Sequence, residues 1–133
     1  MHEMTIRVYY EDTDFGGVVY YANYLKFLER GRTEALRELG VDQVALKEAG
    51  LVFVVRKVVA EYLVPARFDD VLTVVTRVAW VRGASACMAQ NIRRGGETLL
   101  SAEITIACMT LEGRPTRLPT EVRANLVQMQ ADS

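Results

Sequence analysis

The order of the predicted elements constrains the fold of this chain most strongly: one long helix, followed by four long strands joined by short turns. The helix is predicted to begin between Tyr20 and Asn23, with Asn23 as a candidate N-cap, because leucine and alanine then recur near helical spacing. It ends at Gly40, which suits the left-handed conformation that follows many helices. Strands joined by short turns pair antiparallel, so the sequence predicts an α+β fold with a largely antiparallel sheet.

Alternation of apolar and polar residues marks the predicted strands. One strand is predicted before the long helix, over residues 5–10. The later strands are predicted over residues 51–64, 71–82, 84–94 and 97–111. A short helix and loop over residues 41–50 and a C-terminal helix over residues 120–130 complete the expected order.

Two of these strands have a predicted arrangement of faces. The second strand after the helix is expected to carry on one face Leu72, Val74, Val78 and Trp80. The first strand after the helix is expected to carry Phe53, Val55 and Val59 on one face and Val52, Val54 and Val58 on the other, so both of its faces are apolar. Because one helix covers only one face of a sheet, we expect part of the remaining surface to meet another subunit, in at least a homodimer.

Composition and charge limit the remaining possibilities. The 133 residues are predicted to form a single domain, residues 1–133, which can bury a core without disulfides or metal. With 16 basic and 17 acidic residues, the chain has no global field that would attract nucleic acid. No apolar run reaches the roughly 20 residues of a membrane span, and the N-terminus lacks the order of a signal peptide, so a cytoplasmic location is expected.

Acidic residues gather between the first strand and the long helix. Glu11, Asp12 and Asp14 precede the pair Gly16 and Gly17. The first turn of a helix carries unpaired N–H groups and partial positive charge, so it would stabilise an oxyanion. A carboxylate beside these donors could attack a carbonyl, or activate water to attack it, which indicates acyl transfer to water. The structural alternative is an acid that only caps the following turn.

Other catalytic groups are scarce. His2 is the only histidine and lies at the N-terminus, which argues against a Ser-His-Asp or Cys-His site. Cys87 and Cys108 lie in apolar strand segments and are interpreted as buried thiols. The sequence predicts no metal site and no cofactor, so a carboxylate must act alone. A thioester suits such a site, because its thiolate leaves with little help from a general acid.

The segments Asp-Thr-Asp-Phe-Gly-Gly-Val-Val-Tyr (12–20) and Asn-Tyr-Leu (23–25) resemble the hotdog-fold acyl-CoA thioesterases. The similarity is to the 4-hydroxybenzoyl-CoA thioesterase family and, within it, the Tol-Pal-associated branch. It extends over nearly the whole chain, through residues 62–70, 90–92 and 117–119. The resemblance implies a long central helix wrapped by a curved five-stranded sheet. It also implies dimers joined edge to edge, often paired into tetramers, with active sites at the dimer interface.

The resemblance also implies the catalytic groups. The essential carboxylate of the family matches Asp14, and the N–H that polarises the thioester carbonyl matches the backbone of Tyr21, where many members of the branch have histidine. The N–H of Val18 or Gly17 is expected to assist. Asp14 is therefore predicted to be the nucleophile or the general base, and both roles remain open.

Substrate-binding residues are predicted less directly. Arginine and lysine suit the phosphates of coenzyme A, and the candidates are Arg56, Lys57, Arg67, Arg82, Arg93 and Arg94, of which Arg56, Lys57 and Arg93 are taken as the site. The substrate is also expected to contact Gly17, Val18, Tyr20 and Tyr24. The candidates for lining an acyl pocket are Tyr9, Tyr10, Tyr20, Tyr24 and Phe27, although aromatics at strand and helix spacing are more often core.

Two alternatives from other classes remain at this stage. The first is a protein that binds acyl-CoA or acyl carrier protein with little turnover. The second, a hotdog dehydratase, is disfavoured because its catalytic histidine has no candidate in the chain. Thioester hydrolysis is the leading prediction, with acyl-CoA as substrate and acyl carrier protein as a possible second carrier.

Overall fold

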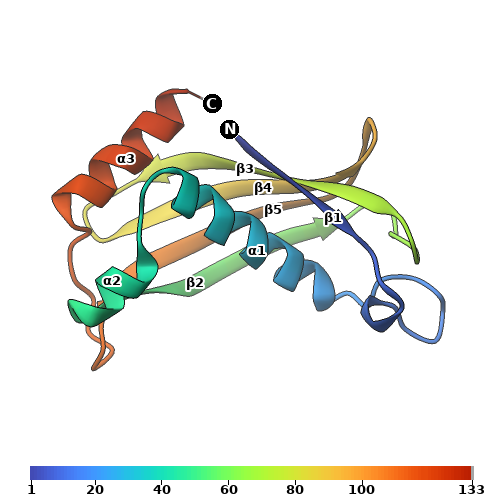
Figure 1. Cartoon of the computed structure of the whole chain (residues 1–133), viewed down its shortest axis with the longest axis horizontal. Helices are drawn as coiled ribbons and strands as arrows, with labels where there is room; N and C mark the ends of the chain where they lie inside the picture. The colour runs from blue at the N-terminus through green and yellow to red at the C-terminus, as the bar shows by residue number, and fades with distance from the viewer. Residues whose placement is uncertain (133) are drawn as a thin grey trace.

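The structure, a computed structural model, describes residues 1–132 and shows a curved sheet wrapped around one long helix (Figure 1). The five strands follow the order β1-β3-β4-β5-β2, and each neighbouring pair is antiparallel. They are β1 (His2–Arg7), β2 (Leu51–Tyr62), β3 (Val71–Val81), β4 (Ser85–Arg94) and β5 (Glu97–Thr110). The predicted α+β class with a largely antiparallel five-stranded sheet is therefore confirmed.

The helices differ in length and position. They are α1 (Asn23–Glu38), α2 (Gln43–Glu48) and α3 (Thr120–Ala131), and a 3-10 turn, η1 (Tyr10–Asp12), follows β1. α1 crosses the concave face of the sheet, α2 lies near β2, and α3 packs along β3 (Figure 1). Among residues 1–132, no helix combines the length and the apolar character needed to cross a membrane.

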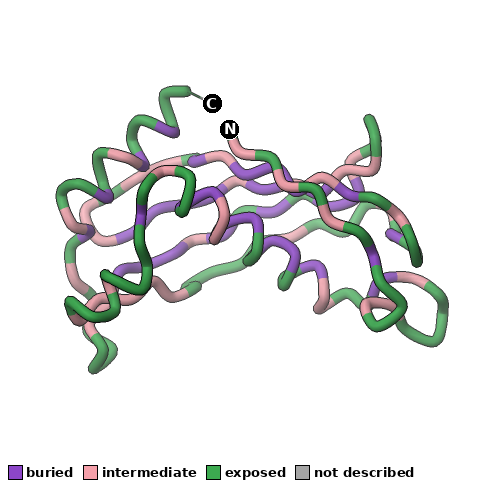
Figure 2. The backbone as a smooth tube through the Cα atoms, viewed as in Figure 1, coloured by how far each residue is buried: buried purple, intermediate pink, exposed green. Residues whose placement is uncertain are grey.

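The core lies between α1 and the concave face of the sheet. Figure 2 shows buried positions concentrated on the central strands and along α1. Phe27 and Leu28 of α1 are almost fully buried, as are Leu72, Met88 and Ile104 of the sheet. Burying each such side chain contributes about 1.5–3 kcal/mol, so this contact fixes the helix on the sheet.

Gly31 allows α1 to approach the sheet closely. A Cβ at this position would lie 2.6 Å from Val74 Cγ1 and 3.3 Å from Gln90 Nε2. No real Cβ contact is that short, so the side chain of any other residue would push α1 away from β3. The absence of a side chain at Gly31 thus sets the spacing of helix and sheet.

The first strand ends earlier than predicted. β1 stops at Arg7, and the chain turns through η1 where the sequence predicted strand up to Tyr10. The alternation was misleading because Val8 is fully buried but pairs with the turn before β3: its N–H donates to Asp70 O at 2.9 Å, and its carbonyl accepts the Asp69 N–H. Tyr10, two residues further along the chain, is largely exposed.

In β3 and in β2, the predicted faces are wrong for the residues that follow a bulge in the strand. The register of β3 shifts between Val78 and Trp80, so Val78 lies opposite Met88 but Trp80 lies opposite Cys87, on the convex face. The register of β2 shifts likewise between Val55 and Lys57, which places Val58, and not Val59, on the face of Val55. Each bulge inserts one residue and so exchanges the two faces of everything that follows.

Candidate active site

The predicted catalytic acid lies on a tight loop between η1 and α1. Thr13 and Val19 form an antiparallel bridge that closes the loop. Inside it, the Asp14 N–H donates to Val18 O at 2.9 Å and the Gly17 N–H donates to Asp14 O at 3.0 Å. Gly17 has a φ of 77°, a conformation that favours glycine, so the turn requires glycine at this position. We call residues 13–19 the Asp14 loop.

The Asp14 carboxylate is exposed and only partly engaged. Its Oδ1 accepts the Gly16 N–H at 2.9 Å, which is the turn-capping contact of the structural alternative. Among residues 1–132, Oδ2 accepts no hydrogen bond and neither oxygen forms an ion pair. Capping and chemistry are therefore compatible, because one oxygen fixes the orientation of the carboxylate and the other remains available.

Asp12 has a different role, because its hydrogen bonds stabilise the turn. Its Oδ2 accepts the Tyr9 N–H at 2.8 Å. Its carbonyl accepts the Tyr20 N–H at 3.0 Å and the Asn23 Nδ2–H at 2.9 Å. Asp12 thus ties η1 to the start of α1. The Asn23 side chain is used in this contact, so the predicted N-cap role for Asn23 is wrong; Ala22 occupies the cap position without a side-chain hydrogen bond.

The N-terminus of α1 presents a free donor. Asn23 N–H donates to Tyr20 O at 2.8 Å and Leu25 N–H to Ala22 O at 3.2 Å. The Tyr21 N–H has no protein acceptor among residues 1–132. An unpaired N–H at a helix N-terminus is suited to an oxyanion, and Tyr21 supplies one near the Asp14 loop.

Tyr20, Tyr21 and Tyr62 lie close together at this position. The rings of Tyr20 and Tyr21 lie 4.9 Å apart, and the Tyr62 hydroxyl donates to Tyr21 O at 2.9 Å. The pKa of Tyr20 is raised, chiefly by a side-chain hydrogen bond with Tyr21 and to a smaller extent by the Asp14 carboxylate. The pKa of Tyr62 is also raised, mainly by burial. The hydroxyls of Tyr20 and Tyr62 therefore stay protonated near neutral pH and act as hydrogen-bond groups.

Tyr24 is in the core, not on the open surface of the site. It is 4% exposed, its ring packs edge-on against Phe27 and Tyr62, and its hydroxyl accepts the Ala66 N–H at 2.9 Å. In the single chain, Tyr24 therefore supports the site from beneath. Gly17 and Tyr20 are exposed and Val18 is half-buried, all within or just after the Asp14 loop.

Exposed aromatic side chains gather around the Asp14 loop. Phe15 is fully exposed and Tyr21 is 63% exposed. Also exposed are Tyr9, Tyr10, Tyr20, Tyr62 and Phe68. Concentrations of exposed apolar groups are typical of surfaces that contact a ligand or another protein chain, and so this end of the molecule has the character of a binding surface.

The predicted phosphate-binding residues do not form one cluster within the chain. Lys57 lies opposite Thr105, and Thr105 lies opposite Cys87 of β4. Cys87 is six residues from Arg93 along β4, so Lys57 and Arg93 are separated by about 20 Å at strand spacing. Arg56 is the extra residue of the β2 bulge and is exposed. The basic residue beside the Asp14 loop is instead Arg67, which pairs with Val18 in an isolated bridge and is exposed.

Comparison with known proteins identifies the class of the fold and site. The thioesterase-like superfamily matches residues 8–126, and the chain therefore belongs to this superfamily of thioester hydrolases. The family and the enzyme class predicted from the sequence are confirmed.

Particular relatives are similar over almost the whole chain. "Acyl-CoA thioester hydrolase YbgC" of Escherichia coli O157:H7 is 46% identical over 125 residues, which cover 92% of this chain and 93% of the relative. "Acyl-CoA thioesterase YbgC" of Haemophilus influenzae is 46% identical over 121 residues, covering 90% and 89%. A probable thioesterase from Bartonella henselae has a solved structure with a TM-score of 0.85 at 44% identity, covering 89% of this chain and 98% of that one. The predicted hotdog fold is confirmed.

Proposed function

We propose that the protein hydrolyses acyl-CoA to a free acid and coenzyme A, with Asp14 as the catalytic carboxylate. The observation that carries this proposal is the placement of Asp14, whose free Oδ2 lies on a loop that leads directly to the unpaired Tyr21 N–H. The family supports thioester hydrolysis, and the names of the relatives from E. coli and H. influenzae support acyl-CoA as the substrate.

In the general-base form of the mechanism, Asp14 removes a proton from water as the water oxygen attacks the thioester carbon. The carbonyl becomes an oxyanion that accepts the Tyr21 N–H, and Val18 N–H is a second candidate donor. The tetrahedral intermediate then collapses, the C–S bond breaks, and the leaving thiolate takes a proton. In the nucleophilic form, Asp14 attacks the same carbon, the thiolate leaves, and water then hydrolyses the anhydride.

A single turnover in ¹⁸O water with enzyme in excess tests for the nucleophilic form. An anhydride opened by attack on the Asp14 carbon leaves ¹⁸O in the Asp14 carboxylate, which general-base catalysis never does. An anhydride opened at the acyl carbon places ¹⁸O in the acid product, as general-base catalysis does, so label in Asp14 is the diagnostic result. Mass spectrometry of the peptide that contains Asp14 makes the measurement. Both forms require Asp14 to be ionised.

The main test is thiol release from acetyl-, hexanoyl-, palmitoyl- and benzoyl-CoA by wild type, Asp14→Asn and Asp14→Ala. We expect both variants to lose at least about 100-fold in kcat, the range of a lost base, while their melting temperatures stay near that of wild type. Glu11→Gln is the matched control, because Glu11 is a neighbouring exposed acid and should keep normal turnover. Normal turnover by Asp14→Asn would contradict the role of Asp14. Tight acyl-CoA binding by wild type without turnover would favour the alternative of a binding protein.

We also propose that the protein acts as a homodimer joined through β2. Among residues 1–132, no strand pairs with the outer edge of β2, which carries three valines, Val55, Val58 and Val59, that are 42–53% exposed. A two-fold axis would pair β2 with β2 of a second copy. It would bring the end of β2 at Tyr62, which contacts Tyr21, against the partner subunit. Light scattering should give at least twice 14.9 kDa, and Val59→Asp should lower it. A monomer at micromolar concentration would contradict the proposal.

A further inference from the structure

The turn at residues 65–70, between β2 and β3, contacts the Asp14 loop at one side and the end of β1 at the other. On the first side, the Val19 N–H donates to Ala66 O at 2.8 Å, and Val18 forms a bridge with Arg67. On the second side, the Val8 N–H donates to Asp70 O at 2.9 Å. The segment that carries Asp14 is thus attached to the 65–70 turn at both of its ends.

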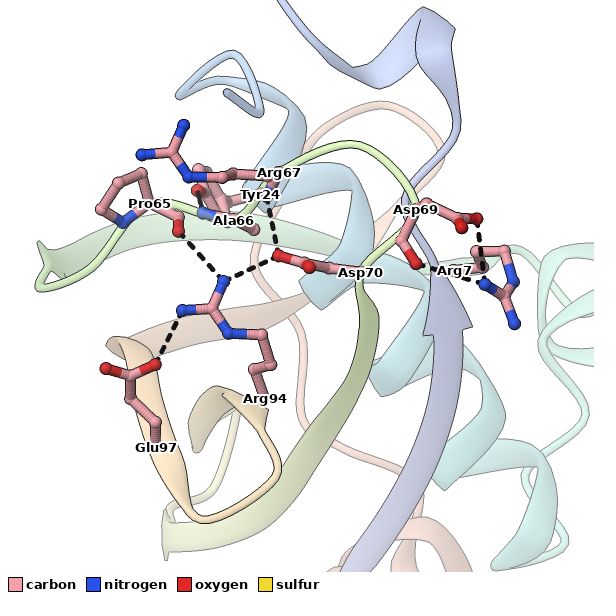
Figure 3. A network of polar contacts seen from close by, with 9 residues as sticks. All are labelled: Arg7, Tyr24, Pro65, Ala66, Arg67, Asp69, Asp70, Arg94 and Glu97. Atoms are coloured by element: carbon pink, nitrogen blue, oxygen red, sulfur yellow. Dashed lines mark hydrogen bonds and ion pairs between the residues drawn. The ribbon is translucent and has the colours of Figure 1, made fainter. Parts of the chain in front are cut away.

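The 65–70 turn is itself held by one carboxylate and one guanidinium (Figure 3). Asp70 Oδ2 accepts the Arg67 N–H at 2.8 Å and Arg94 Nη1–H at 2.7 Å. Arg94 reaches this position from the end of β4, and its Nη2 donates to Glu97 Oε1 at 2.7 Å. One planar side chain therefore fixes the turn to the β4–β5 hairpin, a use for which arginine is suited and lysine is not.

The Asp70–Arg94 ion pair is less exposed to solvent than the neighbouring Arg7–Asp69 pair. The side chains of Asp70 and Arg94 are 22% and 32% exposed, whereas those of Asp69 and Arg7 are 65% and 52% exposed. Exposed pairs contribute little to stability, and partly buried, hydrogen-bonded pairs contribute more. Both pairs contact the same turn, so Arg7 provides a control on the same element.

We propose that Asp70 and Arg94 are positioning residues for thioester hydrolysis, which hold the 65–70 turn and, through it, the Asp14 loop against the N-terminus of α1. The proposal rests on the proposed function. Asp70 Oδ2 accepts the Arg67 N–H, and the carbonyl of the preceding residue, Ala66, accepts the Val19 N–H. Val18 O in turn accepts the Asp14 N–H. Ala66 also donates to the Tyr24 hydroxyl, so the same turn is attached to α1. The relative position of Asp14 and Tyr21 therefore depends on a pair of charges that touches neither.

The test compares Asp70→Asn, Arg94→Gln, Arg94→Lys and the control Arg7→Gln on the best substrate of the acyl-CoA panel. Small displacements of catalytic groups are costly, so we expect kcat to fall about tenfold or more in Asp70→Asn and Arg94→Gln, with KM within about threefold of wild type. Arg94→Lys should recover part of the rate, since it keeps the charge, and Arg7→Gln should match wild type. Amide hydrogen exchange should become faster at Val19 and Val8 in the first two variants but not in the centre of α1.

Four results would overturn the proposal. These are unchanged kcat in both Asp70→Asn and Arg94→Gln, a loss that only follows the unfolded fraction, a rise in KM alone, and unchanged exchange at Val19. If Asp70→Asn does not fold, Arg94→Lys and Arg94→Gln give the comparison. Failure of the proposed function is recognised separately, because wild type would then release no thiol and both proposals fall. If wild type is active, Asp14→Asn inactive and the Asp70 and Arg94 variants normal, only the positioning role is lost.

Discussion

The two ends of α1 are built differently. At its N-terminus, polar backbone contacts and two ion pairs hold loops whose aromatic side chains, such as Phe15 and Tyr21, are exposed. At its C-terminus, α3 covers the part of β3 that β1 leaves unpaired, with Leu126 fully buried and Gln130 Nε2 donating to Ala79 O at 2.9 Å. Apolar burial thus stabilises one end, while at the other end Asp14 Oδ2 and the Tyr21 N–H have no hydrogen-bond partner among residues 1–132. Substitutions at the two ends should therefore separate stability from turnover.

The largest effect on stability is expected from Leu126→Ala at the α3 end. Truncating a fully buried leucine costs about 2–5 kcal/mol, because transfer and cavity terms add. The melting temperature should fall accordingly, while kcat of the folded enzyme should stay within about twofold of wild type. Val127→Ala is the control, since Val127 lies on the same helix but is 41% exposed. A large loss of kcat in folded Leu126→Ala would remove the contrast between the two ends.

The next effect is expected in the middle of α1, from Gly31→Ala. Alanine in place of glycine should favour a helix by about 1 kcal/mol, but its Cβ would lie 2.6 Å from Val74 Cγ1. We expect overpacking to outweigh the gain and to destabilise the protein by about 1–3 kcal/mol. The double variant with Val74→Ala should recover part of the loss relative to the sum of the single changes. Thermal or urea unfolding of the four proteins gives the coupling free energy, and additive effects would contradict the contact.

A smaller and pH-dependent effect is expected at the other end, from Asp70→Asn. Burial alone would raise the pKa of Asp70, but hydrogen bonds from the Arg67 N–H and from Arg94 outweigh it and lower the pKa below the ordinary value of 3.8. A carboxyl with a lowered pKa in the folded state stabilises the protein above its unfolded pKa and loses this contribution as the pH falls through the folded one.

The difference in melting temperature between wild type and Asp70→Asn should therefore be constant from pH 5 to 7 and shrink below about pH 4. Asp69→Asn is the control, because asparagine tolerates the φ of 70° at this position and the Arg7–Asp69 pair is exposed. Its effect should be small at every pH. A pH-independent difference for Asp70→Asn would show that its charge is not what holds the turn.

The smallest effect is expected from Glu38→Gln at the C-terminus of α1. Glu38 Oε2 lies 3.1 Å from His2 Nε2, but the Glu38 side chain is 73% exposed. Such pairs contribute about 0–1 kcal/mol and are screened by salt. We expect a fall of at most a few degrees in melting temperature, and no difference from wild type in 1 M NaCl. A large loss would mean that this end depends on charge as well as on apolar burial.

The sequence by itself determined most of the elements and the place of Asp14 ahead of the long helix. Helical spacing before Gly40, the strand segments that follow it and the acids before the helix are local patterns, and each corresponds to an element or loop of the folded chain. The order of residues was enough to place Asp14 ahead of the helix N-terminus, whereas Tyr21 as the donor was predicted from the family resemblance. Local patterns of this kind are readable because they depend on backbone geometry within a few residues.

Only the tertiary structure decided which side chains meet. The bulges that moved Trp80 and Val58 to other faces arise from pairing with distant strands, and no period in the sequence marks them. The contact of Asp70 with Arg94 joins residues that are 24 positions apart, and Arg94 could not be told from Arg93 by composition. Alternate strand residues point to opposite faces, so one position of register separates a residue that supports Asp14 from one that does not.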